Sequence, residues 1–568
     1  MTDFLNMPKR PTRNRVQRSL SSTGRTTNPL VSVLLPTHNR PRYLAEALAS
    51  VVQQTYRNLE IFVIRDGGQD VADVIRSFCD PRIIFIDREV NRGKPFSLNE
   101  ALSRARGKYV AYLDDDDVYY PCHVETLVKV LEAEPSCGVA YSDLYKVYCE
   151  VLRGGGRVVL SKHVEISRDF DRFLMLYFNH VLHVSLMHRR DLLDKTGPYN
   201  ERLNILIDWD MTRRLAFFTD FLHVPVITGE FYSPVAACDR ISVQQRKDPQ
   251  EYLRNMLAIR TARPAGPWSK IQDLSIILLV ERVDERTAQA LLRIWRHTFY
   301  PYKLHLPLPP GDISRLNVQM PNVELVPVSP ASSETERVDA ALAKSQGDLV
   351  ALVPTRLPIE EMWVEDPLYA LINTAGREGF LLAGATPQSW AAVLRRSDLE
   401  SARRAHPGLS VEASLRAAGV PVRWPRQDQL PFQFDELLRR AKSAEAEGDW
   451  LAAARLFEHM AGRFQNRLWM NAMAAQAYFE GGDRARAGLL SHAANQERAT
   501  VDTLLLEAKV HRHNGDFDAA LGLLGRARQL LDSGGAGVAQ AEENPGLPSS
   551  KYVWRLEDLN EHGYRTNR

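Results

Sequence analysis

One stretch constrains the fold more than any other: a short apolar run, residues 109–113, leads directly into Asp114, Asp115, Asp116 and Asp117. A short run rich in aromatic and β-branched residues predicts a buried strand. A parallel sheet places its ligand site at the carboxyl ends of its strands. Four adjacent carboxylates repel one another unless a cation lies among them, and Mg²⁺ or Mn²⁺ prefers oxygen ligands. The stretch therefore indicates a strand-end site for a metal-bound phosphate compound. The alternative is a solvated acidic turn that caps the next helix.

Length and composition limit the class of protein. A chain of 568 residues predicts about three or four domains. The net charge of +2 gives no reason to expect a nucleic-acid partner. The sequence has no apolar run of membrane-spanning length and no signal-peptide core, so we expect a cytoplasmic protein without a transmembrane segment. Its five cysteines have no CxxC spacing and indicate reduced thiols. Residues 1–28 are basic and predict a disordered arm, for which peripheral contact with an anionic membrane is the alternative to a solvated tail.

The first 113 residues alternate between strand and helix patterns. Strands are predicted at 31–36, 59–64, 83–86 and 109–113, and helices at 43–53 and 97–105. This order predicts a mostly parallel α/β sheet covered by helices on both faces. Three strand ends carry polar residues, namely Thr37 with Asn39, then Asp66, then the four carboxylates. In such a sheet these ends converge on one crevice.

The same segments resemble a known family. Leu-Pro-Thr-His-Asn-Arg at 35–40, Ile-Arg-Asp-Gly-Gly at 64–68, Asn-Arg-Gly at 91–93 and Tyr-Leu-Asp-Asp-Asp-Asp at 112–117 resemble successive motifs of family 2 glycosyltransferases. The resemblance extends to about residue 245 and includes Ile-Asp-Trp-Asp at 207–210. It implies the GT-A (Rossmann-like) fold, with a catalytic domain over 29–260.

The resemblance also implies roles for individual residues. The nucleotide-binding residues would be Pro36, Thr37, Asn39, Asp66, Arg92, Lys94, Asp114 and Asp115. Asp116 and Asp114 would hold Mn²⁺ or Mg²⁺ in a DxD motif, with Asp116 as the direct ligand. Asp208 would be the general base of an inverting transfer, although a helix N-cap is the alternative role and Asp210 a competing base. Two positions depart from the family pattern, because Arg65 and Ile207 stand where acidic residues are usual.

A second copy of the pattern begins near Leu274. Ser-Ile-Ile-Leu at 275–278 parallels Ser-Val-Leu-Leu at 32–35, and the segment 338–351 parallels 98–111. At the position of the four carboxylates, however, the second copy has Pro-Thr-Arg-Leu, residues 354–357. We therefore expect a degenerate GT-A-like α/β domain over 270–425 that lacks metal chemistry. The alternative is a generic βα pattern that mimics a repeat.

After residue 425 the pattern becomes helical and rich in alanine. The turns Gly448-Asp449, Gly482-Asp483 and Gly515-Asp516 recur at intervals of 34 and 33 residues, which resembles tetratricopeptide (TPR) repeats. We expect all-α TPR-like repeats over 432–532 that bind a protein partner. An ordinary helical bundle is the alternative. Residues 533–568 predict a flexible tail that contains a docking helix around Tyr552–Leu556.

These observations favour a metal-dependent, inverting glycosyltransferase of hexosyltransferase type. Its donor would be a nucleotide sugar, with UDP-sugar as the first expectation. Its acceptor would be a glycan, lipid-linked or protein hydroxyl, as in bacterial surface polysaccharide synthesis or protein glycosylation. A non-catalytic scaffold that binds a nucleotide sugar or glycan and recruits partners through its repeats is the alternative. A GT-A nucleotidyltransferase is disfavoured, because Pro-Thr-His-Asn at 36–39 is not a glycine-rich phosphate loop.

Overall fold

A computed structural model describes most of the chain. The described residues are 28–152, 156–164, 167–235, 249–316, 320–426, 429–430, 433–463 and 467–532. The predicted basic arm up to residue 27 and the predicted tail from 533 lie outside them. The chain divides into two compact units, which are treated separately: Met1–Asp171 with Asn179–Tyr252 and Phe434–Arg568, and Arg172–Phe178 with Leu253–Gln433. No helix in the described ranges is long and apolar enough to cross a membrane.

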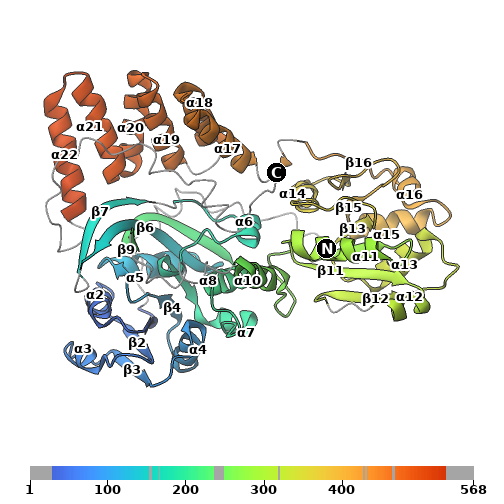
Figure 1. Cartoon of the computed structure of the whole chain (residues 1–568), viewed down its shortest axis with the longest axis horizontal. Helices are drawn as coiled ribbons and strands as arrows, with labels where there is room; N and C mark the ends of the chain where they lie inside the picture. The colour runs from blue at the N-terminus through green and yellow to red at the C-terminus, as the bar shows by residue number, and fades with distance from the viewer. Residues whose placement is uncertain are drawn as a thin grey trace. The chain divides into compact units, whose positions relative to one another are not determined.

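The first unit is built around a nine-stranded sheet (Figure 1). Its strands are β1 (Val31–Thr37), β2 (Leu59–Asp66), β3 (Ile83–Arg88), β4 (Tyr109–Tyr112), β5 (Val118–Tyr119), β6 (Cys137–Val151), β7 (Arg157–Val164), β8 (Leu186–Arg189) and β9 (Asp220–Pro234). The strand order is β3-β2-β1-β4-β8-β6-β9-β5, with β7 paired to β6. The pairs β2–β3, β1–β2 and β1–β4 are parallel. The carboxyl ends of these four strands therefore lie along one edge of the sheet, as the sequence pattern predicts.

Helices separate many of these strands along the chain. They are α2 (Pro41–Val52), α3 (Ala72–Arg76), α4 (Lys94–Arg104), α5 (His123–Ala133), α7 (Leu193–Thr196) and α8 (Ile207–Leu215), with 3₁₀ turns η1 (His183–Ser185) and η2 (Arg190–Leu192). Leu44, Leu48 and Val51 form the buried stripe of α2 and join one core cluster with Val33 and Ile61 of the sheet. The five-residue helix α3 is not predicted by the sequence pattern, because it is too short to show helical periodicity.

The six helices α17 to α22 follow one another as three hairpins, which can be followed in Figure 1. They are α17 (Gln433–Ala446) with α18 (Trp450–Arg463), α19 (Arg467–Glu480) with α20 (Arg484–Arg498), and α21 (Val501–His513) with α22 (Phe517–Asp532). The turn glycines Gly448, Gly482 and Gly515 all have positive φ, near 79°, 86° and 79°. Glycine adopts this conformation without the steric cost of a Cβ, so the glycine spacing in the sequence marks the hairpin turns.

The second unit contains another sheet. Its elements are α6 (Arg172–Tyr177), α10 (Pro249–Thr261), β10 (Leu274–Leu279), α11 (Glu285–His297), β11 (Tyr302–Leu308), α12 (Pro310–Arg315), β12 (Val323–Pro327), α13 (Glu334–Lys344), β13 (Leu349–Pro354), α14 (Glu365–Ile372), β14 (Gly379–Leu381), β15 (Ala392–Arg395), α15 (Arg396–Ala405), α16 (Val411–Ala417) and β16 (Val422–Arg423). The strand order is β12-β11-β10-β13-β15-β14-β16. The order and directions of its first six strands match β3-β2-β1-β4-β8-β6 of the first sheet.

The match extends to single contacts. In the first sheet the amide of Gly107 donates to Ser32 Oγ at 3.0 Å, and in the second the amide of Gly347 donates to Ser275 Oγ at 3.3 Å. A Cβ on either glycine would lie within 3 Å of the serine it contacts. Each glycine therefore lets the chain approach the first strand of its sheet closely just before the fourth strand begins.

Candidate functional site

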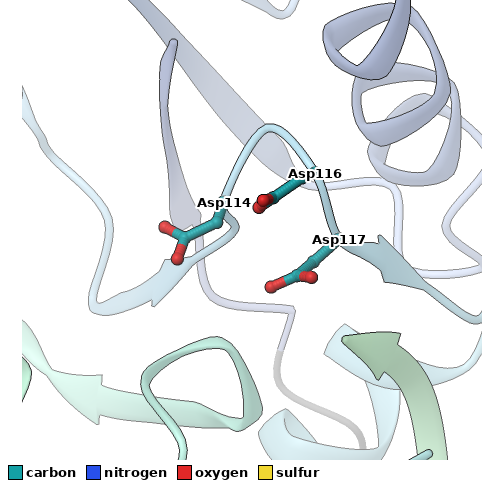
Figure 2. Close-up of side chains that lie close together, drawn as sticks. All are labelled: Asp114, Asp116 and Asp117. Carbon is teal, nitrogen blue, oxygen red and sulfur yellow. The ribbon is translucent and has the colours of Figure 1, made fainter. Parts of the chain in front are cut away.

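The carboxyl edge of the first sheet gathers three of the four consecutive carboxylates. Asp114, Asp116 and Asp117 each offer an oxygen, and these oxygens all lie within 4.8 Å of one another. Figure 2 shows the three side chains projecting from the turn between β4 and β5. The family resemblance implied Asp114 and Asp116 as metal ligands and did not include Asp117. Asp117 also accepts a hydrogen bond from the backbone amide of Tyr232 at 2.9 Å, which ties the turn to β9.

Two cations from neighbouring segments face this turn. Arg40 Nη1 donates to Asp115 Oδ1 at 3.1 Å and to Asp116 Oδ2 at 2.9 Å. Lys94, the first residue of α4, forms an ion pair with Asp114. Burial alone would raise the pKa of Asp114, but the Lys94 charge holds this pKa below its ordinary value. The carboxylate turn is therefore negatively charged and held by groups that could also face a phosphate.

Asp115 differs from its neighbours because it points toward β1. It is buried and accepts from Thr37 Oγ1 at 2.8 Å and, more weakly, from the His38 amide at 3.4 Å. Burial and then the charge of Asp116 raise the pKa of Asp115 to about 6. The sequence-predicted residues Thr37 and Asp115 are thus in direct contact, and Asp115 holds the end of β1 against the acidic turn.

Asp66 lies at the end of β2, as predicted, but both of its carboxylate oxygens already have partners. They accept from the backbone amides of Arg92 and Gly93, each at 2.8 Å. Asp66 therefore fixes the turn that precedes α4, and through it the position of Lys94. A carboxylate has further lone pairs, so a contact with a nucleotide base stays a prediction.

The remaining predicted nucleotide-binding residues lie around the same edge. Pro36 is half-buried at the end of β1, and Asn39 adopts a left-handed φ of 57° and accepts from the amide of Gln69 at 2.8 Å. The guanidinium of Arg92 lies over the ring of Phe96 at 3.3 Å from its centroid, and the side chain is exposed. Unlike Lys94, then, Arg92 stacks on an aromatic ring.

Asp208 lies in the first turn of α8. It is not the N-cap, which is Leu206, and its Oδ2 accepts from Asn179 Nδ2 at 3.0 Å. Burial raises the pKa of Asp208 above its ordinary value, and the Lys94 charge partly offsets this rise. Burial would lower the pKa of Lys94, but the charges of Asp114 and then of Asp208 raise it. Lys94 therefore links Asp208 electrostatically to the acidic turn.

Asp210, the competing base in the sequence analysis, has another role. It is buried and forms an ion pair with Arg214 one turn along α8, at 2.5 Å. Arg214 in turn donates to the carbonyl oxygens of Thr196 and Gly197. Asp210 is thus occupied in joining α8 to α7, which leaves Asp208 as the better candidate base.

Arg157 of β7 contacts this site, and no sequence pattern predicts that contact. Its Nη1 donates to the backbone carbonyl of Asp116 at 2.6 Å, and its Nη2 pairs with Glu46. The guanidinium lies over the rings of Tyr232 and Tyr43, at 3.6 and 4.6 Å from their centroids. Arg157 therefore fixes the backbone of the acidic turn from a segment some forty residues away.

Part of the first unit is similar in sequence to known proteins. Residues 32–182 match the model described as glycosyl transferase family 2. An uncharacterized glycosyltransferase of Rickettsia prowazekii is 30% identical over 193 residues, covering 32% of this chain and 58% of that protein. A PGL/p-HBAD biosynthesis glycosyltransferase of Mycobacterium bovis is 29% identical over 211 residues, covering 35% of this chain and 75% of that protein. The chain spans less than two thirds of the length of several curated relatives that it matches.

One solved structure is a mannosyltransferase from Pyrobaculum calidifontis in complex with GDP-Man and Mn²⁺. It is 17% identical, with a TM-score of 0.32, and the match covers 44% of this chain and 71% of that one.

Proposed function

We propose that the first unit is a metal-dependent glycosyltransferase that moves a sugar from a nucleotide-sugar donor to an acceptor hydroxyl with inversion. One observation carries the proposal: the oxygens of Asp114, Asp116 and Asp117 gather at the carboxyl edge of the sheet, where Lys94 pairs with Asp114. The family 2 match over residues 32–182 supports the reaction class. UDP-sugar is the donor we expect first, and a glycan, lipid-linked or protein hydroxyl is the acceptor.

The residues present fit a divalent cation. Asp114, Asp116 and Asp117 supply only carboxylate oxygens, which Mg²⁺ and Mn²⁺ prefer, and three ligands leave positions for phosphate oxygens. A bound Mn²⁺ or Mg²⁺ would act as a Lewis acid that neutralises the departing diphosphate. The proposed ligands of the cation are Asp116 and Asp114, as the sequence suggested, together with Asp117.

The chain's own groups would bind and orient the donor. Lys94, the first residue of α4, and Arg92, two residues before it, would face phosphate oxygens once Lys94 leaves Asp114. Pro36, Thr37 and Asn39 at the end of β1 would line the nucleotide pocket, with Asp66 and Asp115 fixing the loops around it.

Asp208 would take the proton from the acceptor hydroxyl as that oxygen attacks the anomeric carbon. A carboxylate with a raised pKa is a stronger base than an ordinary aspartate, which suits this role. The bond from the hydroxyl oxygen to the anomeric carbon forms while the bond to the diphosphate breaks. A single displacement of this kind inverts the configuration.

The second candidate function is a scaffold that binds a nucleotide sugar or glycan without transferring it. The second sheet supports a non-catalytic role for its own part of the chain. It repeats the strand order of the first sheet but has Pro-Thr-Arg-Leu at 354–357, where the first has four carboxylates. We propose that it is a degenerate GT-A-like domain, and that the three helical hairpins are TPR-like repeats that recruit a protein partner.

Titration calorimetry of the purified protein with UDP, GDP and dTDP, each with Mn²⁺ and with EDTA, distinguishes the two functions. We expect one nucleotide to bind only with metal, and Asp116→Ala to abolish that binding while the protein stays folded. If a folded sample binds none of the three nucleotides under either condition, the enzyme proposal is wrong and the scaffold is favoured.

A further inference from the structure

A buried histidine packs directly against the strand that leads into the carboxylate turn. His183, the first residue of η1, is 6% exposed, and its ring stacks on Tyr112 with the centroids 4.2 Å apart. Tyr112 ends β4, two residues before Asp114. His183 Nε2 lies 2.8 Å from the Tyr199 hydroxyl, whereas His183 Nδ1 is buried without a hydrogen-bond partner among the described residues. A buried polar atom without a partner costs free energy, which a bound ligand would recover.

A chain of hydrogen bonds determines which nitrogen of His183 carries the proton. At its far end, His188 Nδ1 donates to the carbonyl oxygen of Arg189 at 2.8 Å, because a carbonyl can only accept. Burial lowers the pKa of His188 to about 4, so this ring is neutral and its Nε2 accepts from the Tyr112 hydroxyl at 2.7 Å. Having donated its proton, Tyr112 can only accept from Tyr199, with which it also interacts. Tyr199 in turn accepts from His183 Nε2, which leaves His183 Nδ1 as a bare acceptor.

The charges that act on His183 and Tyr199 are those of the proposed reaction centre. Burial and then the Lys94 charge lower the pKa of His183 to about 3, and the Asp114 charge partly offsets this fall. The ring of His183 is therefore neutral at any pH near neutrality. Burial raises the pKa of Tyr199, and the charge of Asp208 adds to that rise. The His183–Tyr199 pair thus lies within electrostatic reach of both the carboxylate turn and the candidate base.

The proposed reaction puts the transferred sugar between the same two groups. In a single displacement the anomeric carbon lies between the departing diphosphate and the attacking hydroxyl oxygen. The diphosphate would lie on the side of Asp114, and the attacking hydroxyl on the side of Asp208. Sugar hydroxyls donate hydrogen bonds, and an imidazole nitrogen without a proton accepts them. Once Lys94 leaves Asp114 for the phosphates, His183 Nδ1 has the chemistry to bind a hydroxyl of that sugar.

We propose that His183 binds the transferred sugar by accepting a hydrogen bond from one of its ring hydroxyls, and so contributes to the choice of sugar. The inference rests on the proposed function, because it needs a nucleotide-sugar donor at the carboxylate turn. A site that hydrogen-bonds a substrate hydroxyl rejects the analogue that lacks it, because the buried acceptor is then left unpaired. The sugar recognised is therefore one with a free hydroxyl at the position that faces His183.

Two substitutions separate the nitrogens of His183. His183→Gln carries its amide near the position of Nε2, so it keeps a polar contact with Tyr199 but has no acceptor at the position of Nδ1. His183→Asn carries its amide near the position of Nδ1 and loses the contact with Tyr199. His123→Asn is the matched control, because it removes another buried, unpartnered ring nitrogen, Nε2 of His123, and keeps the contact with Thr228.

Calorimetric titration of the full-length protein with Mn²⁺ compares the nucleotide that binds with its sugar conjugates. These are UDP-glucose, UDP-galactose and UDP-N-acetylglucosamine for UDP, GDP-mannose for GDP and dTDP-glucose for dTDP. We expect His183→Gln to weaken binding of the tightest conjugate by roughly three- to tenfold and to leave the affinity for the nucleotide unchanged. His183→Asn should keep the affinity for that conjugate within about twofold, and His123→Asn should change neither affinity.

A set of monodeoxy conjugates identifies the hydroxyl. The analogue that lacks the contacted hydroxyl should bind the unmodified protein as weakly as the full conjugate binds His183→Gln. In His183→Gln the loss of that hydroxyl should cost nothing further, because the two changes remove the same hydrogen bond.

Several outcomes would overturn the inference. One is an unchanged affinity of His183→Gln for the conjugate. Another is an equal loss of affinity for conjugate and nucleotide, since His183 would then only support the fold around the turn. A third is a deoxy effect that persists in full in His183→Gln. These results leave metal-dependent nucleotide binding intact, whereas a folded, unmodified protein that binds no nucleotide would overturn the proposed function together with this inference.

Discussion

After the fourth parallel strand of its sheet, the first unit carries Asp114 and Asp116, whereas the second unit carries Pro354 and Arg356 at the equivalent positions. The registers correspond, because Val31 pairs with Tyr109 in one sheet and Leu274 with Leu349 in the other. Topology is therefore the same at both edges, and only the side chains differ.

The cations show the same contrast. In the first unit Arg40 and Lys94 pair with the acidic turn, so positive charge surrounds a cluster of carboxylates. In the second unit Arg356 pairs with Glu281 at 3.2 Å, and both side chains are more than half exposed. A sheet can thus keep its core and its turns after the acidic residues at its edge have been replaced. The residues that form the core are not the residues that stand at the edge.

The largest effect should come from removing one carboxylate. We expect Asp116→Ala to lower sugar transfer by at least ~100-fold, because a metal ligand and a charge are lost where the diphosphate departs. Arg356→Ala is the matched control at the equivalent position of the second sheet and should leave turnover unchanged. Turnover is measured by release of the nucleoside diphosphate, and folding by circular dichroism. Equal losses in both variants would refute the assignment of the chemistry to the first sheet alone.

Asp208→Asn tests the base. Its turnover should fall by ~10²–10⁴-fold while calorimetric affinity for the donor nucleotide stays close to that of the unmodified protein. The substitution keeps the shape of the side chain and its contact with Asn179 but cannot accept a proton. A parallel loss of nucleotide affinity would instead place Asp208 in donor binding.

Arg157→Met should weaken metal-dependent nucleotide binding by roughly tenfold, the effect typical of a group that orients a ligand without touching the metal. Methionine fills a similar volume between Tyr43 and Tyr232 but cannot donate to the Asp116 carbonyl. Glu46→Gln removes only the exposed partner of Arg157 and should have little effect. If the two variants bind nucleotide equally, Arg157 has no positioning role.

The pH dependence of kcat/KM tests the coupling of Lys94 to Asp208. The base must be ionised, so activity should fall as pH drops through the raised pKa of Asp208. Lys94→Met removes a charge that lowers this pKa, so the remaining activity of the variant should be lost at a higher pH. An unchanged acidic limb would show that Lys94 does not influence the base.

The smallest effect is expected at the edge of the second sheet. Breaking the Glu281–Arg356 pair with Glu281→Gln should change the free energy of unfolding by less than about 1 kcal/mol, because exposed ion pairs are weak and screened by salt. Urea denaturation followed by circular dichroism measures it. A larger loss would mean that this pair, unlike most exposed pairs, holds the edge together.

The sequence determined where the first four strands of the first sheet lie and where the acidic residues stand along the chain. Apolar runs followed by polar residues marked β1, β2 and β4 and their ends, and the glycine spacing marked the three hairpin turns. These features are local, so periodicity and residue type suffice to predict them. The internal repeat was also visible in the sequence, and the two sheets do share a strand order.

Only the tertiary structure decided which contacts each carboxylate makes. Four adjacent aspartates are indistinguishable by residue type, yet Asp115 turns toward Thr37, Asp117 joins the cluster, and Asp66 is occupied by the amides of Arg92 and Gly93. The contact of Arg157 with the acidic turn has no sequence signal, because it depends on how β7 pairs with β6. Contacts between segments distant along the chain follow from packing geometry, which residue type and spacing do not encode.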